Sequence, residues 1–381
     1  MHDPWYKSTF QYSALGKNLT IHIPHDVFST QRIDEGTLLL LDHLPESKPT
    51  TILDMGCGYG ALGLPIAASY PETKIDMVDR DLLAAAWSKK NAEANSLNNV
   101  NAFGSLGFRD VHQTYDWILC NVPARIGEPF IKNLIHLGCS RLNAGGELRV
   151  VVINDLLPLV NEMKLIIKGP RHSILSISTS ELSAKPTPPE SLYLRDQVKV
   201  ADLQLDRPFD LGGDDQKRLK AGLPVLLDAL PRSIPASDFK ILNFRSGYGQ
   251  ISLHCKKKWP HATVVAIDRD LLGTTFVRHN ALQLGLSDGL DVRESAHFPD
   301  AIHLEEKFNL ISGELSPSAG EAVALAELKA IEKSLAPKGE AIILCFEKLE
   351  KDWIKKFASM SKLSIFKVLT REGYTVVRLS K

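Results

Sequence analysis

The chain has 381 residues, of which 44% are hydrophobic and 24% are charged. These proportions are ordinary for a globular protein with a sizeable core, and the length predicts about two domains. The 45 Lys and Arg residues balance 45 Asp and Glu residues. This balance excludes a protein that binds nucleic acid through bulk positive charge, but it still allows a local basic patch.

The N-terminal segment, MHDPWYKSTF, has neither the basic nor the apolar region of a secretory signal. No run approaches the roughly 18 apolar residues of a transmembrane helix. The five cysteines are scattered and show no CxxC spacing, and the histidines do not fall at metal-ligand spacings. We therefore expect a cytoplasmic protein with reduced thiols, no membrane span and no metal site.

Strand-like and helix-like segments alternate along the first half of the chain. An apolar strand is expected over Thr51–Met55, followed by a glycine-rich turn and a helix over Ala61–Ser69. The alternation continues with a strand, a helix and two more strands: Lys74–Val78, Leu82–Ala94, Asp116–Cys120 and Glu147–Ile153. This pattern predicts βαβ units, and therefore an α/β fold whose mostly parallel sheet carries helices on both faces.

A glycine-rich loop, Asp54-Met-Gly56-Cys-Gly58-Tyr-Gly60, follows the first of these strands. Glycines allow a sharp turn and the close approach of a ligand, and Asp79, at the end of the next strand, could accept hydrogen bonds from two ribose hydroxyls. The GxGxG spacing differs from the dinucleotide GxGxxG pattern and suits S-adenosylmethionine (SAM), which has no pyrophosphate and whose amino group needs an anion such as Asp54. These five residues are the predicted cofactor site. The alternative is that the glycines only make a turn and Asp79 caps the next helix.

The second half of the chain repeats the first. ILDMGCGYGALGLPIAASYP from Ile52 corresponds to ILNFRSGYGQISLHCKKKWP from Ile241, and the sequence DRDLL begins at both Asp79 and Asp268. Both pairs of positions are 189 residues apart, which indicates one duplicated domain rather than a short-period repeat.

A Pro- and Ser-rich segment separates the two copies, at Ser183–Ser191. We therefore predict a first domain over residues 1–182, a linker over 183–193 and a second domain over 194–381. The last residues predict an antiparallel hairpin around Arg371-Glu-Gly373.

The first half resembles the small-domain class I SAM-dependent methyltransferases, and especially the tandem-domain enzymes that methylate guanine N2 in ribosomal RNA. The segments that carry the resemblance are VFSTQRIDEGTLLLLDHL (Val27–Leu44), LDMGCGYG (Leu53–Gly60), Asp79, DWILCNVPA (Asp116–Ala124) and LNAGGELRVV (Leu142–Val151). The resemblance implies two tandem Rossmann-like domains, SAM as the cofactor, and structured RNA, above all ribosomal RNA, as substrate and partner.

The resemblance also implies a role for Asn121-Val-Pro123-Ala124, where the family has Asn-Pro-Pro-aromatic. The Asn side-chain carbonyl and a backbone carbonyl would accept both protons of an exocyclic amine and direct its lone pair toward the methyl group. Asn121 and Pro123 are therefore the predicted catalytic pair, although they could also simply end the strand. Ala124 replaces the aromatic residue that would stack on a flipped base, so another group, for example Phe108 or Phe130, would have to hold the base.

Two more contacts are expected around this site. Ser105, after the third strand, could bond the edge of the adenine. The segment Asp34-Glu-Gly-Thr37 closes over cofactor and substrate in the family that the chain resembles, so Thr37 and Ala124 are predicted to contact the substrate. On physical grounds the same segment also predicts a helix N-cap.

The second copy departs from this pattern. It has Asn243 for Asp54, Arg245 for Gly56 and Glu314 for Asn121. A long cationic side chain in the glycine turn would fill the space of the cofactor and repel a sulfonium, so we expect a copy that does not catalyse. Asp268 is retained, which is compatible with a nucleoside-like ligand.

Basic segments also lie in the second copy, at Lys217-Arg-Leu-Lys220 and Lys256-Lys-Lys-Trp259. They indicate either an RNA contact with Trp259 as a stacking residue or, the reading we favour, a solvated helix end. The sequence thus predicts a SAM-dependent methyltransferase acting on an RNA guanine amine. Neutral charge and Ala124 favour an alternative, a methyltransferase for a small molecule or protein, and the altered motif favours a non-catalytic SAM- or RNA-binding protein.

Overall fold

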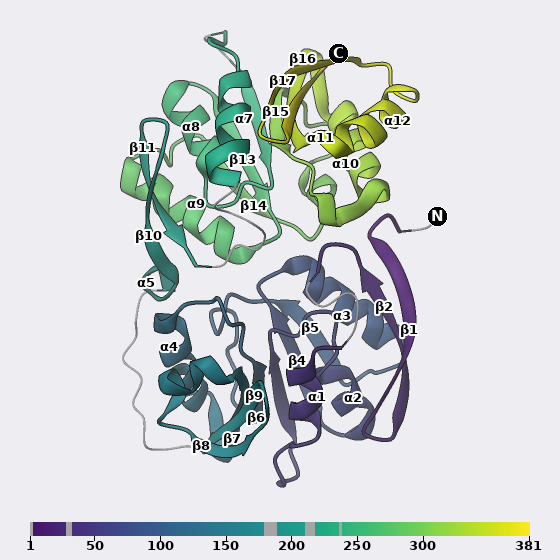
Figure 1. The fold of residues 1–381 in the computed structure, drawn as a ribbon, viewed down its shortest axis with the longest axis vertical. Coiled ribbons are helices and arrows are strands. Elements are labelled where there is room, and N and C mark those ends of the chain that lie inside the picture. The colour runs from purple at the N-terminus through teal and green to yellow at the C-terminus, as the bar shows by residue number, and fades with distance from the viewer. Residues whose placement is uncertain (1–2, 28–32, 179–188, 210–217, 236–237) are drawn as a thin grey trace. The chain divides into compact units, whose positions relative to one another are not determined.

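The computed structural model describes residues 3–27, 33–178, 189–209, 218–235 and 238–381. The chain divides into two compact units (Figure 1). The first domain runs from Tyr6 to Arg195, and the second domain runs from Asp196 to Lys381 and also includes the N-terminal residues through Trp5. The first part of the predicted linker, residues 183–188, lies outside the described residues, and its last five residues form the short helix α5 (Pro189–Tyr193).

The first domain is built on a seven-stranded sheet in the order β5-β4-β3-β6-β7-β9-β8. Its strands are β3 (Thr51–Met55), β4 (Lys74–Asp79), β5 (Val100–Gly104), β6 (Tyr115–Asn121), β7 (Leu142–Ile153), β8 (Lys164–Lys168) and β9 (His172–Ser178). All neighbours from β5 to β7 are parallel, whereas β9 runs antiparallel to both β7 and β8. The carboxyl ends of β3 to β6 therefore meet at one edge, where ligands bind in open α/β sheets.

Helices connect the parallel strands, and a hairpin precedes them. The helical segments are α1 (Glu35–Leu41), α2 (Gly63–Ser69), α3 (Leu82–Ala94), α4 (Glu128–Cys139) and the 3-10 helix η1 (Asn154–Val160). The hairpin consists of β1 (Tyr6–Ala14) and β2 (Lys17–Pro24), with Leu15 and Gly16 at positive φ in its turn.

The second domain repeats this architecture, with a sheet in the order β14-β13-β12-β15-β16-β18-β17. Its strands are β12 (Lys240–Phe244), β13 (Thr263–Asp268), β14 (Leu290–Glu294), β15 (Phe308–Glu314), β16 (Leu335–Phe346), β17 (Ser364–Arg371) and β18 (Tyr374–Ser380), and a hairpin of β10 (Leu194–Val200) and β11 (Leu203–Pro208) precedes them. Its helical segments are η2 (Arg218–Gly222), α7 (Leu223–Ala229), α8 (Gln250–Lys258), α9 (Leu271–Leu284), η3 (Phe298–Ala301), η4 (Pro317–Ala319), α10 (Gly320–Ser334), α11 (Glu347–Leu349), η5 (Glu350–Ile354) and α12 (Lys355–Ala358). The predicted duplication and the α/β fold with two mostly parallel sheets are therefore confirmed.

Apolar side chains on both faces of the parallel strands form the two cores. In β6 the central residues Trp117, Ile118 and Leu119 are all fully buried, as expected for a strand that is covered on both faces. β15 has the same burial pattern along its length. All five cysteines are thiols within these interiors.

Several predicted boundaries agree with the structure. The strand Thr51–Met55, the helix Leu82–Ala94 and the C-terminal hairpin around Gly373 are all observed. The helix predicted from Ala61 instead begins at Gly63, because Gly60, at a φ of 100°, still belongs to the loop.

None of the described helices has both the length and the apolar character that a membrane-spanning segment requires. In the same part of the chain, His, Cys, Asp and Glu side chains do not gather in groups of three that could hold a metal ion.

Candidate active site

The glycine-rich loop joins β3 to α2, and three of its backbone amides donate to the end of β4. The amides of Gly56 and Cys57 donate to the carbonyl of Val78 at 2.8 and 3.0 Å, and the amide of Gly58 donates to Asp79 Oδ2 at 2.9 Å. Gly56 and Gly58 have φ values of 78° and 57°, which glycine adopts without steric cost. The loop is therefore preorganised before any ligand binds.

The space in front of this loop fits a ligand that approaches the backbone closely. A Cβ atom added to Gly56 or to Gly58 would meet no heavy atom within 4 Å. At Gly60, in contrast, an added Cβ would lie 2.4 Å from Leu64 Cδ1. The first two glycines thus border open space, where the predicted SAM would lie, and the third packs against α2.

Asp54 lies beneath the loop. Its side chain is 1% exposed, and Oδ2 accepts a hydrogen bond from the amide of Gly63 at 2.9 Å. Burial raises the pKa of Asp54 to about 7, an effect that the Gly63 hydrogen bond opposes and the nearby Asp79 reinforces. In this position Asp54 fixes the start of α2 directly beneath the glycine-rich loop.

Asp79 is the last residue of β4, and its carboxylate bonds both the glycine-rich loop after β3 and the residue that caps α3. Its Oδ2 accepts from the amide of Gly58 and its Oδ1 accepts from the amide of Asp81, both at 2.9 Å. Burial raises the pKa of Asp79, and the backbone hydrogen bonds oppose this rise. The N-cap of α3 is Asp81, whose side chain accepts from Leu83, so Asp79 itself is not the helix cap, and its carboxylate remains the predicted partner of the ribose.

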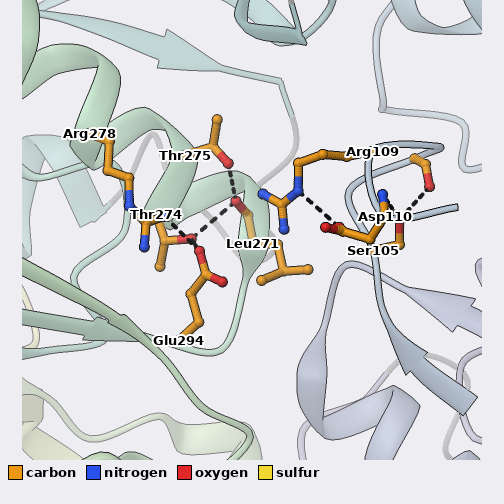
Figure 2. Close-up of polar contacts among 9 residues, drawn as sticks. Ser105, Arg109, Asp110, Leu271, Thr274, Thr275, Arg278 and Glu294 are labelled. Atoms are coloured by element: carbon orange, nitrogen blue, oxygen red, sulfur yellow. Dashed lines mark hydrogen bonds and ion pairs between the residues drawn. The ribbon is translucent and has the colours of Figure 1, made fainter. Parts of the chain in front are cut away.

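Ser105 closes a turn immediately after β5. Its hydroxyl donates to the carbonyl of Gly107 at 2.8 Å and accepts from the amide of Asp110 at 3.1 Å, while Arg109 pairs with Asp110 (Figure 2). The side chain is 2% exposed. The hydroxyl proton is therefore engaged in the turn, and Ser105 would shape the adenine end of the site through this turn.

The acceptor corner joins β6 to the start of α1. Asn121 Nδ2 donates to Asp34 Oδ2 at 2.8 Å and to Thr37 Oγ1 at 3.1 Å. The same Asp34 oxygen caps α1 by accepting from the amides of Gly36 and Thr37. Both contacts of Asn121 use Nδ2, so within the described residues its carbonyl oxygen Oδ1 accepts no hydrogen bond. The structure thus brings the predicted Asn121 and Thr37 together and adds Asp34 to them.

The other residues that were predicted to contact the substrate differ in how exposed they are. Pro123 and Ala124 are exposed beyond the end of β6. Phe108 and Phe130 are only 6% and 5% exposed, and Phe130 packs against Tyr193 with ring centroids 5.0 Å apart. The suggestion that one of these two rings stacks on a base is therefore wrong, because both rings are already packed in the interior.

The basic segment at the end of α8 is also engaged within its own domain. Lys256 donates to the carbonyls of Pro260 and Ala262 at 2.7 and 2.8 Å, and Lys258 donates to that of Pro231. Trp259 is 4% exposed, so it cannot serve as a stacking residue for RNA. These contacts agree with the helix-end interpretation; in the other basic segment, Lys217 lies outside the described residues.

Sequence reasoning missed two residues of α3 that hold the loop. Asn91 donates to the carbonyl of Tyr59 at 2.9 Å and exchanges two hydrogen bonds with His22 of β2. Ser88 donates to the carbonyl of Gly58 at 2.9 Å. The repeat contains a signal for the first of them, because Asn280 occupies the matching position of α9 and donates to the carbonyl of Tyr248 in the same way.

Comparisons with known proteins agree with this geometry. Residues 18–169 match the family model of the methyltransferase small domain. The Bacillus subtilis protein YbxB, which is uncharacterised, is 35% identical over 149 residues, which make up 38% of this chain and 74% of that protein. A Haemophilus influenzae ribosomal RNA small subunit methyltransferase C is 36% identical over 154 residues, so this chain covers 46% of its length, less than half.

The whole fold resembles that of a solved structure. The T. thermophilus 16S rRNA N2 G1207 methyltransferase, solved with AdoMet and guanosine, aligns over 98% of both chains with a TM-score of 0.68 and 16% sequence identity. That similarity covers both tandem domains, whereas the family model matches residues within the first. This chain belongs to the methyltransferase small domain family, whose members are SAM-dependent methyltransferases.

Proposed function

We propose that the first domain binds SAM and transfers its methyl group to the exocyclic amine of a guanine in ribosomal RNA. In this proposal, Gly56, Gly58 and Gly60 form the cofactor loop, Asp54 supports it from below, and Asp79 binds the ribose. The proposal includes the cytoplasmic location expected from the sequence.

The observation that carries the proposal is the orientation of Asn121. An exocyclic amine is a weak nucleophile because its lone pair is delocalised into the base. Asn121 Oδ1 is available to accept one N–H of that amine, since Asp34 and Thr37 hold Nδ2. The backbone carbonyl after Asn121 would accept the other N–H, so that the lone pair points toward the methyl group.

SAM, when bound, supplies an electrophilic methyl group on a sulfonium. The acceptor nitrogen forms the new N–C bond while the C–S bond breaks and its electron pair stays on sulfur. The methylated nitrogen then loses one proton to solvent, so the site needs no general base. Asn121 and Pro123 contribute orientation, which is the main catalytic contribution available to a preorganised site of this kind.

Ribosomal RNA is favoured as substrate by the relatives, since two proteins named ribosomal RNA small subunit methyltransferase C are 36% identical to this chain over 154 and 141 residues. A small-molecule or protein acceptor is the second candidate. It is favoured by Ala124, which is exposed and offers no ring for base stacking, and by the burial of Phe108 and Phe130.

The test is methyl transfer from tritiated SAM by the purified full-length chain. Ribosomal RNA, tRNA, protein and small-molecule fractions from cells that lack this protein serve as acceptors. We expect label in ribosomal RNA, on the exocyclic nitrogen of guanine after nuclease digestion. Label confined to the small-molecule or protein fractions would establish the second candidate instead.

Asn121→Ala should abolish the transfer while SAM affinity stays within about threefold of wild type. Glu314→Ala is the matched control, because Glu314 ends β15 at the equivalent position of the second domain. It should leave the rate unchanged. A fully active Asn121→Ala variant would refute the acceptor role.

A further inference from the structure

The second domain retains the framework of a nucleoside site. The amide of Gly247 donates to Asp268 Oδ2 at 2.8 Å, as that of Gly58 does to Asp79. The turn after β14 also matches, because the Ser295 hydroxyl donates to the carbonyl of His297 at 2.8 Å. His297 therefore corresponds to Gly107 of the first domain, in the turn at the adenine end of the site.

Arg245 takes the place of Gly56 in the second domain. In a SAM site this position would lie beside the methionine moiety. Arg245 adopts a φ of 50°, so the left-handed backbone of the loop is kept despite the side chain. Its guanidinium pairs with Glu327 Oε1 of α10 at 2.8 Å, and Glu327 is 3% exposed. At the equivalent position of α4 the first domain has Leu134.

The two substitutions therefore belong together. A buried carboxylate without a partner would be costly, and the Arg245 guanidinium supplies its counter-charge. In the first domain these two positions hold Gly56, which borders open space, and Leu134. In the second domain the Arg245–Glu327 ion pair spans the same region. A sulfonium and an ammonium would meet a cation there.

At the adenine end, the pocket holds an aromatic ring from the same domain. Trp5 packs against His297 with ring centroids 4.0 Å apart and an interplanar angle of 36°, and Trp5 is 9% exposed. Trp5, Arg245, Asp268, His297 and Glu327 all line one pocket, in which only about 20 Å³ remains. That volume suits a water molecule but no nucleoside.

We propose that the nucleoside pocket of the second domain is closed by the chain itself, with the Trp5 indole at the adenine end and the Arg245–Glu327 pair at the methionine end. The indole is a flat bicyclic ring, like a purine, and offers a π-face to the His297 ring. The second domain therefore binds no SAM, although Asp268 and the surrounding turns are kept. Once Trp5 is removed, the adenine end admits adenosine, which lacks the methionine moiety that Arg245 obstructs.

The experiment is calorimetric titration of the full-length chain with adenosine in the presence of saturating SAM, which occupies the first domain. Wild type should show no adenosine binding. Trp5→Ala should show one adenosine site per chain, and Trp5→Phe, which keeps a ring, should bind adenosine at least tenfold more weakly than Trp5→Ala. Phe10→Ala, an aromatic truncation in β1 of the first domain, is the matched control and should behave as wild type.

His297→Gly provides an independent variant, because it restores the residue found at Gly107 and removes the surface on which Trp5 packs. It should also admit adenosine. The stoichiometry of SAM should remain one per chain in wild type and in Trp5→Ala, since Arg245 is still present. A second SAM in either protein, or no adenosine binding in folded Trp5→Ala and His297→Gly, would overturn the proposal.

Discussion

Asp34 is the residue that links the start of α1 to the end of β6. A single carboxylate oxygen accepts from the amides of Gly36 and Thr37 and from Asn121 Nδ2. In the proposed reaction Asp34 would act on the acceptor amine through Asn121, as a positioning residue. An added Cβ at Gly36 would lie 2.9 Å from this oxygen and 3.4 Å from Asn121 Nδ2, which explains the small residue there.

We predict that Asp34→Ala lowers the rate of methyl transfer at saturating SAM about tenfold, because the Asn121 amide loses the contact that sets its orientation. The KM for SAM should change less than twofold. Loss of the N-cap should also cost about 1 kcal/mol of stability. Steady-state kinetics with RNA as acceptor and urea unfolding measure the two effects.

Asp270→Ala separates the two effects, because Asp270 caps α9 in the second domain by accepting from the amide of Leu272. It should lose a similar amount of stability and no activity. Equal losses of activity in Asp34→Ala and Asp270→Ala would show that Asp34 has only a structural role.

The raised pKa of Asp54 predicts a pH-dependent stability. Between the ordinary value of 3.8 and about 7, folded Asp54 holds a proton that the unfolded chain has released. Its contribution is therefore fully present below about pH 4 and is lost as the pH rises to 7, by roughly 2–4 kcal/mol. Asp54→Asn cannot titrate, but its carbonyl can still accept from Gly63.

Urea unfolding at several pH values between 4.5 and 8 tests this expectation. The free energy of unfolding of wild type should fall more steeply over this range than that of Asp54→Asn. Parallel curves for wild type and Asp54→Asn would contradict the assigned pKa.

At the scale of the element, the glycines in the loop between β3 and α2 have different surroundings. Gly56 borders open space, whereas the Cβ of any residue at position 60 would collide with Leu64. The second domain shows that an Arg is compatible with the backbone at the first position, since Arg245 adopts a φ of 50°.

Gly56→Arg should therefore fold with a cost of only about 1–2 kcal/mol and lose SAM binding, because the side chain would enter the proposed cofactor space. Gly60→Ala should instead destabilise the domain by roughly 2 kcal/mol or more, through the contact with Leu64 and the φ of 100°. Thermal melting of both variants measures the effect on packing, and SAM titration measures the effect on ligand binding. Tight SAM binding by Gly56→Arg would contradict the assigned site.

The elements were predictable to the extent that they have a local pattern. Thr51–Met55 is a short apolar run that ends at a glycine turn, and Leu82–Ala94 follows an Asp that caps it. In the first hairpin, β2 has such a pattern, because Leu19, Ile21 and Ile23 alternate as buried residues, whereas β1 is mostly exposed without regular alternation and the turn places Leu15 at a positive φ.

The polar contacts of the site were less predictable than its motifs. Asp34 and Asn121 are 87 residues apart and meet only because α1 packs near the end of β6. The packing of Phe108 and Phe130 was likewise hidden, since a phenylalanine after a strand looks the same in sequence whether it faces the core or a ligand. Residue types and spacing identify the chemistry, whereas tertiary packing decides which side chains are available.

At the scale of the whole molecule, the duplication has left two similar frameworks that differ at the glycine loop and at the strand end. Both keep the aspartate at the end of the second parallel strand, its hydrogen bond from the loop and the asparagine that holds the loop carbonyl. Only the first keeps open space beside its glycines and an Asn at the acceptor corner. The neutral net charge of the chain agrees with a protein that binds its cofactor in a specific pocket.

The difference between the two domains was partly visible in the sequence, because Arg245 and Glu314 replace Gly56 and Asn121. The ion pair with Glu327 and the position of Trp5 were not, because each joins residues that are far apart in the chain. Sequence comparison between the copies shows that a residue has changed, and the structure shows what compensates for the change.

The central claim is that the first domain alone binds SAM, with Asp79 at the ribose. Calorimetric titration of SAM into wild type, Asp79→Ala and Asp268→Ala tests it directly. The account predicts one SAM per chain in wild type, at least tenfold weaker binding in Asp79→Ala, since charge-assisted hydrogen bonds to the ribose are lost, and unchanged binding in Asp268→Ala. Wild-type affinity in Asp79→Ala, or its loss in Asp268→Ala, would contradict the claim.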